Sequence, residues 1–525
     1  MEATSTRYIA ALTPKLVGLL VTSILIYGLA RLPGWLRKVD TWRKYCSSHS
    51  KFSRAAGEGK CLWLEDPWSS SPPPPCRSAI QETDHRAGFD WFHFAGWEIP
   101  TMDSRYKKTV RNADSTVHRE LAKSKLSSLL DSVRRIGFGE IERYKTAVGN
   151  EGKHVSLHTL LYRLGYNVNC IGIFGPVLDH VKTRVILQNF TERQHEMFNC
   201  FNWPLPLWLT SLVVPGARHT VKARKQLFDQ LLSWYNTGGV AIASQEMQAV
   251  VRVFEEAKTS PDVGSKFLNM MMIAFLANTP ETLGWLFTHL IQSPKLFGIV
   301  RAECDAVGDI DGTAPFLKLT PHLYSALFET CRLYVFTGTP ATVIKPTTLP
   351  GMGDHVFLPG DILHSMGQSA AMDVQVYGED AKFWKGHRFV GEGEHLLKYD
   401  LTFGIGRSPC PGRNFAIAEL CLIATRMVQT FNFSEPMVTE RLRFGDADFE
   451  LRSPKPERNV DIIDLDGKVY RIIHPGNGSD RGKSHTRSIP PLGASLTMGG
   501  FAGPPGMTAA NTPENDFACK LTPRM

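Results

Sequence analysis

The sequence predicts a mainly α-helical fold with a minor β component. Most of the region between residues 115 and 292 consists of helix-length segments in which apolar residues recur at every third or fourth position. Short β-like stretches follow further along the chain, at residues 341–344 and 355–358. The composition allows a sizeable core, because 43% of the 525 residues are hydrophobic and 21% are charged, as in ordinary globular proteins.

An uncharged apolar run, residues 16–30, lies near the N-terminus. It is shorter than the roughly 20 residues of a membrane span, but it reaches that length if residues 8–12 are counted and the Lys15 side chain extends to the membrane surface. Basic residues follow the run, which places the next domain in the cytosol. We therefore expect a single membrane helix within residues 1–38. A cleaved signal peptide is the alternative, although no small-x-small cleavage site follows the run.

Two further segments differ in composition from the rest of the chain. Residues 39–88 show neither helical nor strand periodicity and contain a run of serines and prolines, so we expect an irregular segment there. After Pro475 the sequence is rich in Gly, Pro, Ser and Thr, which predicts a disordered tail over residues 476–525. Residues 89–475 then form one large folded domain.

Recurring apolar residues within this domain predict helices near residues 115–136, 157–174, 182–199 and 221–256. Residues 266–292 form the most apolar segment, and a helix that is apolar on all sides is a buried one. Pro280 lies near its centre, where a missing N–H kinks a helix.

Polar residues surround Pro280 in the middle of this apolar segment. Such groups are costly in a core unless they have partners or a task. We therefore expect this helix to form one wall of an active site, lined by Asn278, Thr279, Glu281 and Thr282.

Cys410 lies between glycines, directly ahead of another helical pattern. A thiol in a turn that leads into a helix faces free backbone N–H groups and the positive end of the helix dipole, and both favour the thiolate. Gly404, Gly406 and Gly412 leave no Cβ in the way of a flat group that lies against the backbone. Such a loop is suited to axial ligation of haem iron. The alternative is an inert thiol in a turn.

The net charge and the other cysteines limit the classes of function. The charge of +8 is modest and is not concentrated in basic blocks, so it favours an acidic membrane surface or an acidic protein partner rather than nucleic acid. The ten cysteines include no C-x-x-C pair, which argues against a zinc site or a redox dithiol. Their scatter along the chain is typical of a protein from a reducing compartment.

The stretch 403–416 resembles the haem-binding signature of the cytochrome P450 family, F-x-x-G-x-R-x-C-x-G followed by a helix with R-x-x-A. The positions that stand in register are Phe403, Gly406, Cys410, Gly412 and Ala416. The resemblance implies that Cys410 is the axial ligand of the iron of haem b, and that Phe403 packs against the loop and shields the sulfur.

The signature departs from the family at one position. Ser408 replaces the arginine that holds a haem propionate in the family, and its neighbour Arg407 offers a substitute. Lys345 stands in a region where relatives carry a cation that reaches a propionate. The resemblance thus assigns the cofactor contacts to Phe403, Gly404, Arg407, Cys410, Gly412 and Lys345.

Two further motifs follow the order of the family. Glu329 and Arg332 form an E-x-x-R pair on one helix face, a pattern that alone predicts no more than a surface ion pair. In the family this pair joins an arginine further along the chain in a buried ion network that braces the haem pocket. The matching arginine is Arg388, which Phe389 follows.

The apolar helix matches the family less well. The family carries A/G-G-x-D/E-T-T there, with an acid and an alcohol that deliver protons to dioxygen at the iron. Here Pro280 stands at the position of the acid and Glu281 at that of the first threonine, so that Glu281 and Thr282 form a pair displaced by one position. The A-N-T-P sequence at 277–280 is similar to the E-class branch that contains sterol 7α-hydroxylases and prostacyclin synthase.

The resemblance implies a monooxygenase with the cytochrome P450 fold, whose haem-thiolate catalytic domain covers residues 89–475. The expected reaction inserts one oxygen atom from O2 into a sterol, a terpenoid or another lipophilic metabolite. The sequence shows no nicotinamide fingerprint and no flavin domain, so we expect electrons from a separate NADPH–cytochrome reductase. We expect the enzyme in the endoplasmic reticulum membrane, with its catalytic domain in the cytosol.

Two alternatives stay open. Some members of the branch rearrange or dehydrate an oxygenated lipid without a reductase, and Pro280 at the acid position favours that reaction. A haem protein without catalysis is the second alternative, because residues 39–88 lack the clear strands and the substrate-contacting loop that the family carries there.

Overall fold

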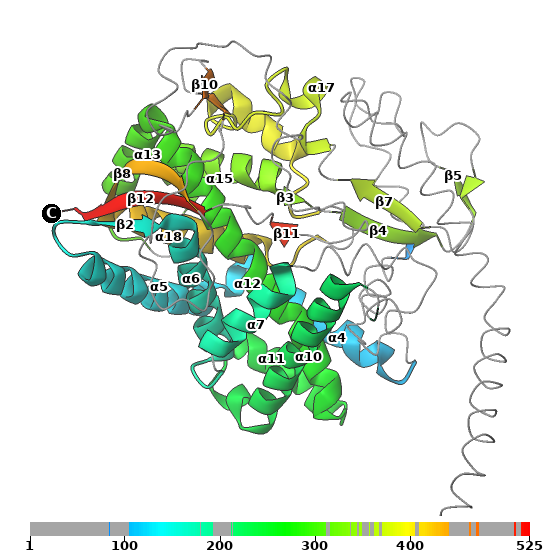
Figure 1. Cartoon of the computed structure of the whole chain (residues 1–525). Coiled ribbons are helices and arrows are strands. Elements are labelled where there is room, and N and C mark those ends of the chain that lie inside the picture. The colour runs from blue at the N-terminus through cyan, green and yellow to red at the C-terminus, as the bar shows by residue number, and fades with distance from the viewer. Residues whose placement is uncertain are drawn as a thin grey trace, which may run out of the picture.

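The computed structural model shows a body of α-helices with several small β-sheets attached (Figure 1). It describes residues 83–84, 104–178, 180–192, 212, 214–310, 315–336, 338–343, 346–348, 356–357, 362–366, 370–404, 409–439, 461–463, 469–471, 509–510 and 516–524. The membrane helix expected within residues 1–38 lies outside this part of the chain. Among the described helices, none is long and apolar enough to cross a membrane.

Helices make up most of the described chain. The α-helices are α4 (Ser104–Glu120), α5 (Ser127–Val148), α6 (Leu157–Asn169), α7 (His180–Glu192), α10 (Pro215–Asn236), α11 (Gln245–Glu256), α12 (Pro261–Gln292), α13 (Pro294–Val307), α14 (Phe316–Leu319), α15 (Pro321–Tyr334), α17 (Val374–Tyr377) and α18 (Arg413–Thr430). The shorter helical segments are η2 (Lys123–Lys125), η4 (Gly239–Ile242) and η5 (Gly391–Tyr399), which are 3-10 helices, and η3 (Cys170–Phe174), a π-helical turn that continues α6.

Two of the expected helices are each divided in two. The single helix expected over 221–256 is wrong, because α10 ends before Gly238, which takes a positive φ of 83°. The indole ring of Trp234 covers the following Gly239 so closely that a Cβ there would lie 2.2 Å from the ring. The helix expected over 115–136 is likewise divided between α4 and α5.

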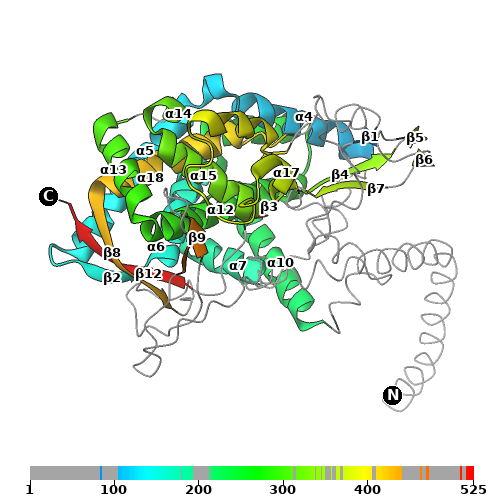
Figure 2. The same ribbon diagram turned by 90° about the horizontal axis from the view of Figure 1, so that it is seen from above.

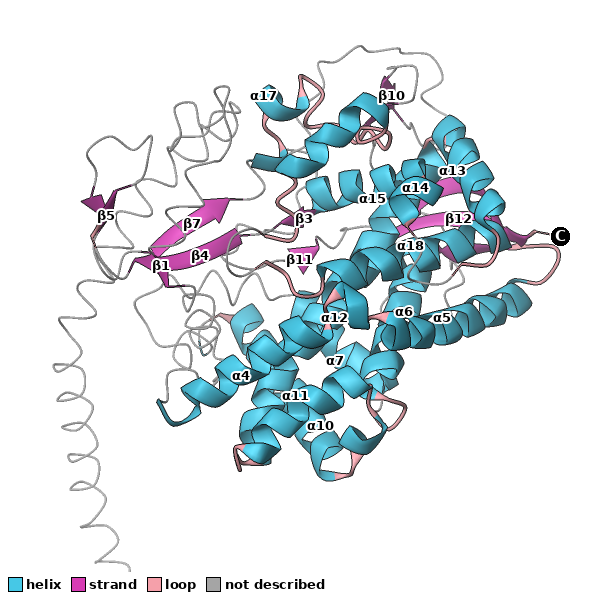
Figure 3. Ribbon diagram, turned by 180° about the vertical axis from the view of Figure 1, so that it is seen from behind, coloured by secondary structure: helices cyan, strands magenta, loops and turns pink. Residues whose placement is uncertain are grey.

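α12 crosses the middle of the helical body and packs against α6, α10 and α15 (Figures 1 and 3). It begins at Pro261 and continues as one helix through Pro280. Gly165 of α6 lies against Pro280, and a Cβ on this glycine would be only 3.2 Å from the proline ring. The missing side chain lets α6 and α12 approach closely at the residue where α12 lacks a backbone N–H.

The β component is divided among small antiparallel sheets. β4 lies between β1 and β7, β12 lies between β8 and β2, and the remaining pairs are β3 with β11, β5 with β6, and β9 with β10. The strands are β1 (Thr83–Asp84), β2 (Lys153–Ser156), β3 (Val335–Phe336), β4 (Gly338–Val343), β5 (Thr347–Thr348), β6 (Val356–Phe357), β7 (Ile362–Met366), β8 (Phe431–Thr439), β9 (Asp461–Ile463), β10 (Val469–Arg471), β11 (Ala509–Ala510) and β12 (Asp516–Pro523).

The two three-stranded sheets lie at opposite ends of the helical body (Figure 2). The predicted mainly helical fold with a minor β component is confirmed. The segment 39–88, expected to be irregular, contributes β1, which pairs with β4. The rest of that segment lies outside the described residues.

The prediction of a disordered tail over residues 476–525 is wrong for its last part. β12 is the central strand of its sheet and pairs with both β8 and β2. The side chains of Cys519 and Leu521 are fully buried. Arg524 then forms a two-pronged ion pair with Asp305 of α13, with N–O distances of 2.7 and 2.8 Å. Pairing with two strands that lie far away in sequence outweighs the local composition of the tail.

Candidate active site

Cys410 lies in a short turn immediately before α18. Its N–H donates to the carbonyl of Phe403 at 2.7 Å, and the Arg413 N–H donates to the Cys410 carbonyl at 3.3 Å. Gly404 has a φ of 69°, a left-handed conformation that glycine adopts without strain. These features hold the cysteine at the first turn of the helix, as its spacing from the helical pattern predicts.

The Cys410 sulfur experiences two opposing influences. Burial by the surrounding protein raises the pKa of the thiol above its ordinary value and is the larger influence. The Gly412 and Arg413 N–H groups and the charge of Arg413 lower that pKa. The residue as a whole is exposed, although protein surrounds much of its sulfur. Coordination to a metal ion deprotonates a thiol outright, so the raised pKa does not prevent ligation.

The polar residues of α12 point in different directions. Asn278 is partly exposed, whereas Thr279, Glu281 and Thr282 are buried. The Thr282 hydroxyl donates to the Asn278 carbonyl at 2.9 Å, within the helix. Ala274, one turn before Asn278, is exposed. Of the four predicted residues, Asn278 is therefore the one that lies on an open face of α12.

Thr279 turns toward a buried carboxyl group. Its side chain hydrogen-bonds Glu419 of α18, and the Asn169 amide at the end of α6 donates to the same carboxyl at 2.7 Å. Burial raises the pKa of Glu419 to about 8, although both hydrogen bonds act to lower it. At neutral pH this carboxyl is therefore mostly protonated, and it joins α12 to the helix that follows Cys410.

An aromatic contact joins the same two helices a little nearer to the cysteine. Phe275 of α12 and Phe415 of α18 pack edge to face, with 6.0 Å between their ring centres. Phe415 is fully buried, and it lies in the first turn of α18. The open face of α12 and the cysteine turn are thus held in a fixed relation by packed side chains.

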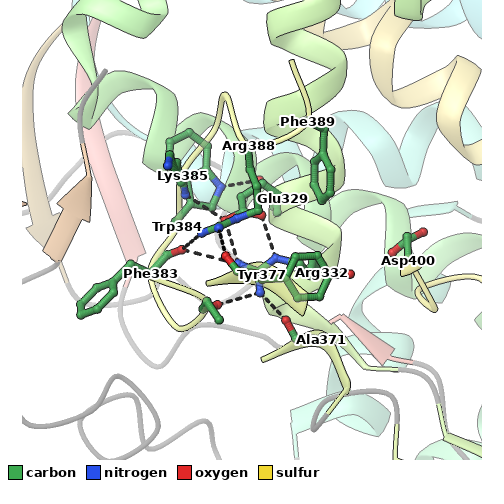
Figure 4. A network of polar contacts seen from close by, with 12 residues as sticks. Glu329, Arg332, Ala371, Tyr377, Phe383, Trp384, Lys385, Arg388, Phe389 and Asp400 are labelled. Carbon is green, nitrogen blue, oxygen red and sulfur yellow. Dashed lines mark hydrogen bonds and ion pairs between the residues drawn. The ribbon is translucent and has the colours of Figure 1, made fainter. Parts of the chain in front are cut away.

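The structure brings Glu329, Arg332 and Arg388 together in a buried network (Figure 4). Arg332 donates two hydrogen bonds of 2.7 Å to the Glu329 carboxylate, and Arg388 donates one of 2.9 Å. Arg388 also pairs with Asp380 at 2.6 Å. The exposed fraction of the three central side chains is 3% or less. The surface ion pair that E-x-x-R alone predicts is therefore not what forms.

Every charged group in this network has partners. Burial raises the pKa of Glu329, but Arg332 and Arg388 outweigh it and hold that pKa below its ordinary value. The remaining guanidinium N–H groups donate to the backbone carbonyls of Ala371, Tyr377, Asp380, Ala381 and Phe383. A buried ion pair is tolerated only when its other hydrogen-bonding sites are satisfied in this way. The network fastens α15 to the segment that leads toward the cysteine turn.

Sequence reasoning missed two carboxyl groups. Asp380 lies eight residues before Arg388, and an acid so close to the predicted arginine was a signal of a partner. Glu419 is the only acidic residue of α18. A fully buried acid among the mainly apolar neighbours Ala418, Leu420 and Leu422 is costly without a role, so this residue was also identifiable as a candidate. Arg407 and Lys345, the predicted propionate ligands, lie outside the described residues.

The model of the family "Cytochrome P450" matches residues 100–458, more than half of the chain. This chain belongs to the cytochrome P450 family. The cofactor of the family is haem, whose iron is held by an axial cysteine thiolate.

The relatives of this P450 are distant. A cytochrome P450 monooxygenase of Penicillium decumbens is 28% identical over 254 residues, which are 44% of this chain and 47% of the relative. A 7-alpha-hydroxycholest-4-en-3-one 12-alpha-hydroxylase of Oryctolagus cuniculus is 27% identical over 330 residues, 58% of this chain and 64% of the relative. A self-sufficient cytochrome P450 monooxygenase of Exserohilum turcicum is 29% identical over 201 residues, 37% of this chain and 18% of the relative. The chain thus spans less than two thirds of the length of each of these relatives.

The described residues of this P450 fit a haem. Cys410 is exposed, whereas the other described cysteines are buried and behave as small apolar side chains: Cys170, Cys304, Cys331, Cys421 and Cys519. A Cβ on Gly412 would touch the Cys410 sulfur at 3.7 Å, so glycine keeps that side of the thiol free. The Arg413 guanidinium lies 5.7 Å from the centre of the Phe403 ring, which fixes the ring beside the turn.

Proposed function

We propose that this cytochrome P450 is a haem-thiolate monooxygenase in which Cys410 is the axial ligand of the iron. The observation that carries the proposal is the exposed Cys410 thiol before the first turn of α18, in register with the family signature. When bound, the haem supplies the iron at which dioxygen is activated, and a thiolate ligand favours O–O cleavage. The protein's own part is to hold the sulfur, to position the substrate and to move protons.

On the thiolate side, the chain controls access to the sulfur. Phe403 shields it from one direction, and its ring is held in place by Arg413. Gly404 and Gly412 let the backbone lie close to a flat group. Arg407 and Lys345 are the proposed partners of the haem propionates, since a cation pairs well with a carboxylate in a protein site.

On the opposite side, α12 offers one partly exposed amide and a buried acid–alcohol pair. Asn278 lies on the open face, where its side chain can orient a substrate or a water molecule. We assign proton delivery to Glu281 and Thr282, which lie in the turn that follows Pro280. Thr279 helps to fix the position of α12, because its side chain hydrogen-bonds Glu419 of α18.

The substrate is proposed to be a lipophilic molecule, with sterols as the first class to test. In the two turns of α12 before Asn278, the described side chains that are exposed or partly exposed are all apolar: Met270, Ile273, Ala274 and Phe275. A wall of this kind binds a hydrophobic surface and offers one polar contact at the amide. The relative from Oryctolagus cuniculus is named for the 12-alpha-hydroxylation of 7-alpha-hydroxycholest-4-en-3-one, a compound with a cholestane skeleton, and this supports the choice of sterols.

The proposed electron donor is a separate NADPH–cytochrome reductase. The net charge of +8 suits association with an acidic partner surface. The proposed location is the endoplasmic reticulum membrane, with residues 1–38 as the anchor and the catalytic domain in the cytosol. This location rests on the apolar run and its basic flank.

A second candidate function is the rearrangement or dehydration of an oxygenated lipid. Two observations on α12 favour it: Pro280 provides no acid, and the Thr282 hydroxyl is engaged with the Asn278 carbonyl. Such a reaction needs neither a reductase nor an acid–alcohol pair. The two candidate functions therefore differ in their need for electrons.

Turnover in a reconstituted system decides between them. The haem-loaded protein is incubated with sterols and, separately, with lipid peroxides, in the presence and absence of NADPH and reductase. Monooxygenation predicts sterol products that are heavier by one oxygen atom and appear only with NADPH and reductase. Conversion of a peroxide without either component would instead establish the second function. A haem-loaded protein that converts neither substrate would be a haem protein without catalysis.

The displaced acid–alcohol pair is tested by a matched pair of variants. Thr282→Ala should divert reducing equivalents from product to hydrogen peroxide, because the hydroxyl that steers protons is lost. Thr288→Ala is the control, since the Thr288 hydroxyl is also buried and donates to the carbonyl one turn before it, that of Gly284, at 2.8 Å. If the two variants placed equal fractions of the reducing equivalents in product, Thr282 would have no role in proton delivery.

A further inference from the structure

Four aromatic side chains form a continuous buried stack between α12, α15 and the segment that carries Arg388. Trp285 and His289 lie one turn apart on α12, Tyr334 is the last residue of α15, and Trp384 precedes the Arg388 motif. All four are buried, with exposed fractions of 7% or less. The stack is separate from the cysteine turn and from the residues assigned above to proton delivery.

The rings lie close together and nearly parallel. Trp285 stacks on Tyr334, with 4.1 Å between ring centres and 9° between planes. His289 stacks on Trp384 at 4.8 Å and 10°. A hydrogen bond of 2.7 Å between the Tyr334 hydroxyl and His289 Nε2 joins the two stacked pairs. The indole N–H of Trp384 donates to the Thr330 hydroxyl at 3.0 Å, which fixes the orientation of this end.

The polar pair at the centre is not explained by packing alone. His289 Nδ1 finds no hydrogen-bond partner among the described residues, although the ring is 1% exposed. A buried polar atom without a partner costs free energy that a leucine of similar size would avoid. An imidazole retained under that cost points to a chemical use of its nitrogen.

Phenol and indole are the side chains from which one electron is most readily removed, apart from thiols. A phenol that loses an electron becomes a strong acid, so its oxidation is easy only where a base is ready to take the proton. Burial lowers the pKa of His289 to about 3 and raises that of Tyr334, so both are neutral at rest. A neutral imidazole in hydrogen-bond contact is such a base.

We propose that Tyr334 is a redox-active tyrosine, which a one-electron oxidant oxidises through the stacked indoles while its proton passes to His289. In this step the Tyr334 O–H bond breaks and an N–H bond forms at His289 Nε2. The electron leaves through Trp285 or Trp384 to the oxidant, which is reduced by one equivalent. The products are a neutral tyrosyl radical and an imidazolium. The step requires the tautomer in which His289 carries its hydrogen on Nδ1.

In the working enzyme, a bound haem that is oxidised when no substrate is present would supply this one-electron oxidant. In this respect the inference rests on the proposed function. Trp285 lies three residues after Thr282 on α12, so the stack begins one turn beyond the residues assigned to the oxygen side. When no substrate is present, the stacked rings would let an electron pass from Tyr334 to the oxidised haem, which leaves the radical on Tyr334.

Freeze-quench electron paramagnetic resonance tests the proposal directly. Haem-loaded protein is mixed with a peracid in the absence of substrate and frozen, and the radical is identified by its ring-proton couplings and their loss on ring deuteration of tyrosine. Wild-type protein should give a tyrosyl signal. Tyr334→Phe, which keeps the ring stack, should lose it. His289→Gln, which keeps a hydrogen-bonding group but replaces the imidazole with a much poorer proton acceptor, should lose most of it.

Tyr166→Phe is the matched control, because Tyr166 is equally buried but its hydroxyl faces Cys170 rather than a histidine. Its signal should equal that of the wild type. A tyrosyl signal that survives in Tyr334→Phe, or a haem-loaded wild-type protein without one, would overturn the proposal. If the variants do not fold, pulsed electron paramagnetic resonance of the wild-type radical replaces them. A radical that is hydrogen-bonded to His289 should show a strongly coupled exchangeable proton near its oxygen. The absence of this proton would contradict the proposed role of His289.

Haem binding and the site of the radical are measured separately. Haem loading is measured first by its absorption. A protein that binds no haem contradicts the proposed function, and in that case a photochemical one-electron oxidant is used on the same variants. A protein that binds haem but forms its radical elsewhere contradicts the role of Tyr334 alone.

Discussion

Glu329 and Glu419 are two fully buried carboxyl groups with opposite surroundings. Glu329 of α15 lies between two guanidinium groups, those of Arg332 and Arg388. Glu419 of α18 has an amide and a hydroxyl as its partners, from Asn169 and Thr279. The pKa of the first is lowered and that of the second is raised to about 8.

The difference shows that burial alone does not decide the charge of a buried acid. Desolvation raises the pKa in both places and is the largest single influence on each. Two cations overcome it at Glu329, whereas neutral hydrogen bonds do not overcome it at Glu419. The first residue therefore holds the fold together as an anion, and the second joins α12 to α18 as a neutral acid.

The largest expected effect follows the loss of the charge at Glu329. Glu329→Gln leaves Arg332 and Arg388 buried without their carboxylate, which should destabilise the protein by about 3–5 kcal/mol and reduce haem loading. Chemical unfolding measures the change. The control is Glu142→Gln, whose partner Arg426 is on the surface and lies 2.8 Å away; its expected cost is about 0–1 kcal/mol. If Glu329→Gln and Glu142→Gln lowered the free energy of unfolding equally, the buried network would contribute no more to stability than a surface ion pair.

The pH dependence of Glu419 is the next effect in size. Because its folded pKa of about 8 exceeds the ordinary 4.5, the folded state keeps a proton that the unfolded state has lost between these values. Stability should therefore fall as pH rises through this window, by up to about 1.4 kcal/mol per pH unit, and level off above it.

Glu419→Gln should remove this contribution, because an amide stays neutral at every pH. Unfolding is measured for both proteins at intervals from pH 5 to above the folded pKa, and the difference between the two curves isolates Glu419. Glu329 works in the opposite sense: its lowered pKa adds stability above the ordinary 4.5 that is lost as pH falls below it. A difference curve for Glu419 that is flat would show that this carboxyl is ionised in the fold.

A smaller effect should follow the loss of the Asn169 amide. Asn169→Ala removes the 2.7 Å hydrogen bond to Glu419, at a cost of about 1 kcal/mol, and raises the pKa of that carboxyl further. Infrared spectroscopy detects the protonated carboxyl, and its band should persist to higher pH in the variant. A band that disappears at lower pH than in the wild type would reverse the role given to the amide.

The smallest effect is expected at the end of the chain. Arg524→Gln removes the ion pair with Asp305, which is partly exposed, so the cost should be less than about 1 kcal/mol. Thermal unfolding measures it, and the effect should shrink further at high salt because exposed pairs are screened. A cost comparable to that of Glu329→Gln would show that the end of β12 is a main support of the fold.

Patterns with fixed spacing were predictable from the sequence. The Cys410 turn and the E-x-x-R pair each depend on residues at set intervals along one element, so their local geometry follows from helix periodicity. The structure adds what spacing does not contain: the Glu329 pair is buried, and Arg388 and Asp380 complete it from another segment.

Features that depend on contacts between distant segments were not predictable in the same way. The last strand, β12, follows a long stretch rich in Gly, Pro, Ser and Thr, and its partners β8 and β2 lie far away in sequence. The alternation of Phe517, Cys519 and Leu521 is a strand signal, but it does not show which strands β12 pairs with. The direction of Thr279 also depends on a partner, Glu419, that lies on another helix. Local sequence patterns identify candidate residues, whereas the contacts between these residues depend on the tertiary fold.

Whether Cys410 ligates the haem iron is read from the absorption spectrum of the reduced carbon monoxide complex. The wild-type protein should show the red-shifted Soret band that only a thiolate-ligated haem gives. Cys410→Ser should abolish that band, and Cys421→Ala, which alters a buried cysteine of the helix that follows the turn, should retain it. A thiolate-type band that persists in Cys410→Ser would show that another residue ligates the iron.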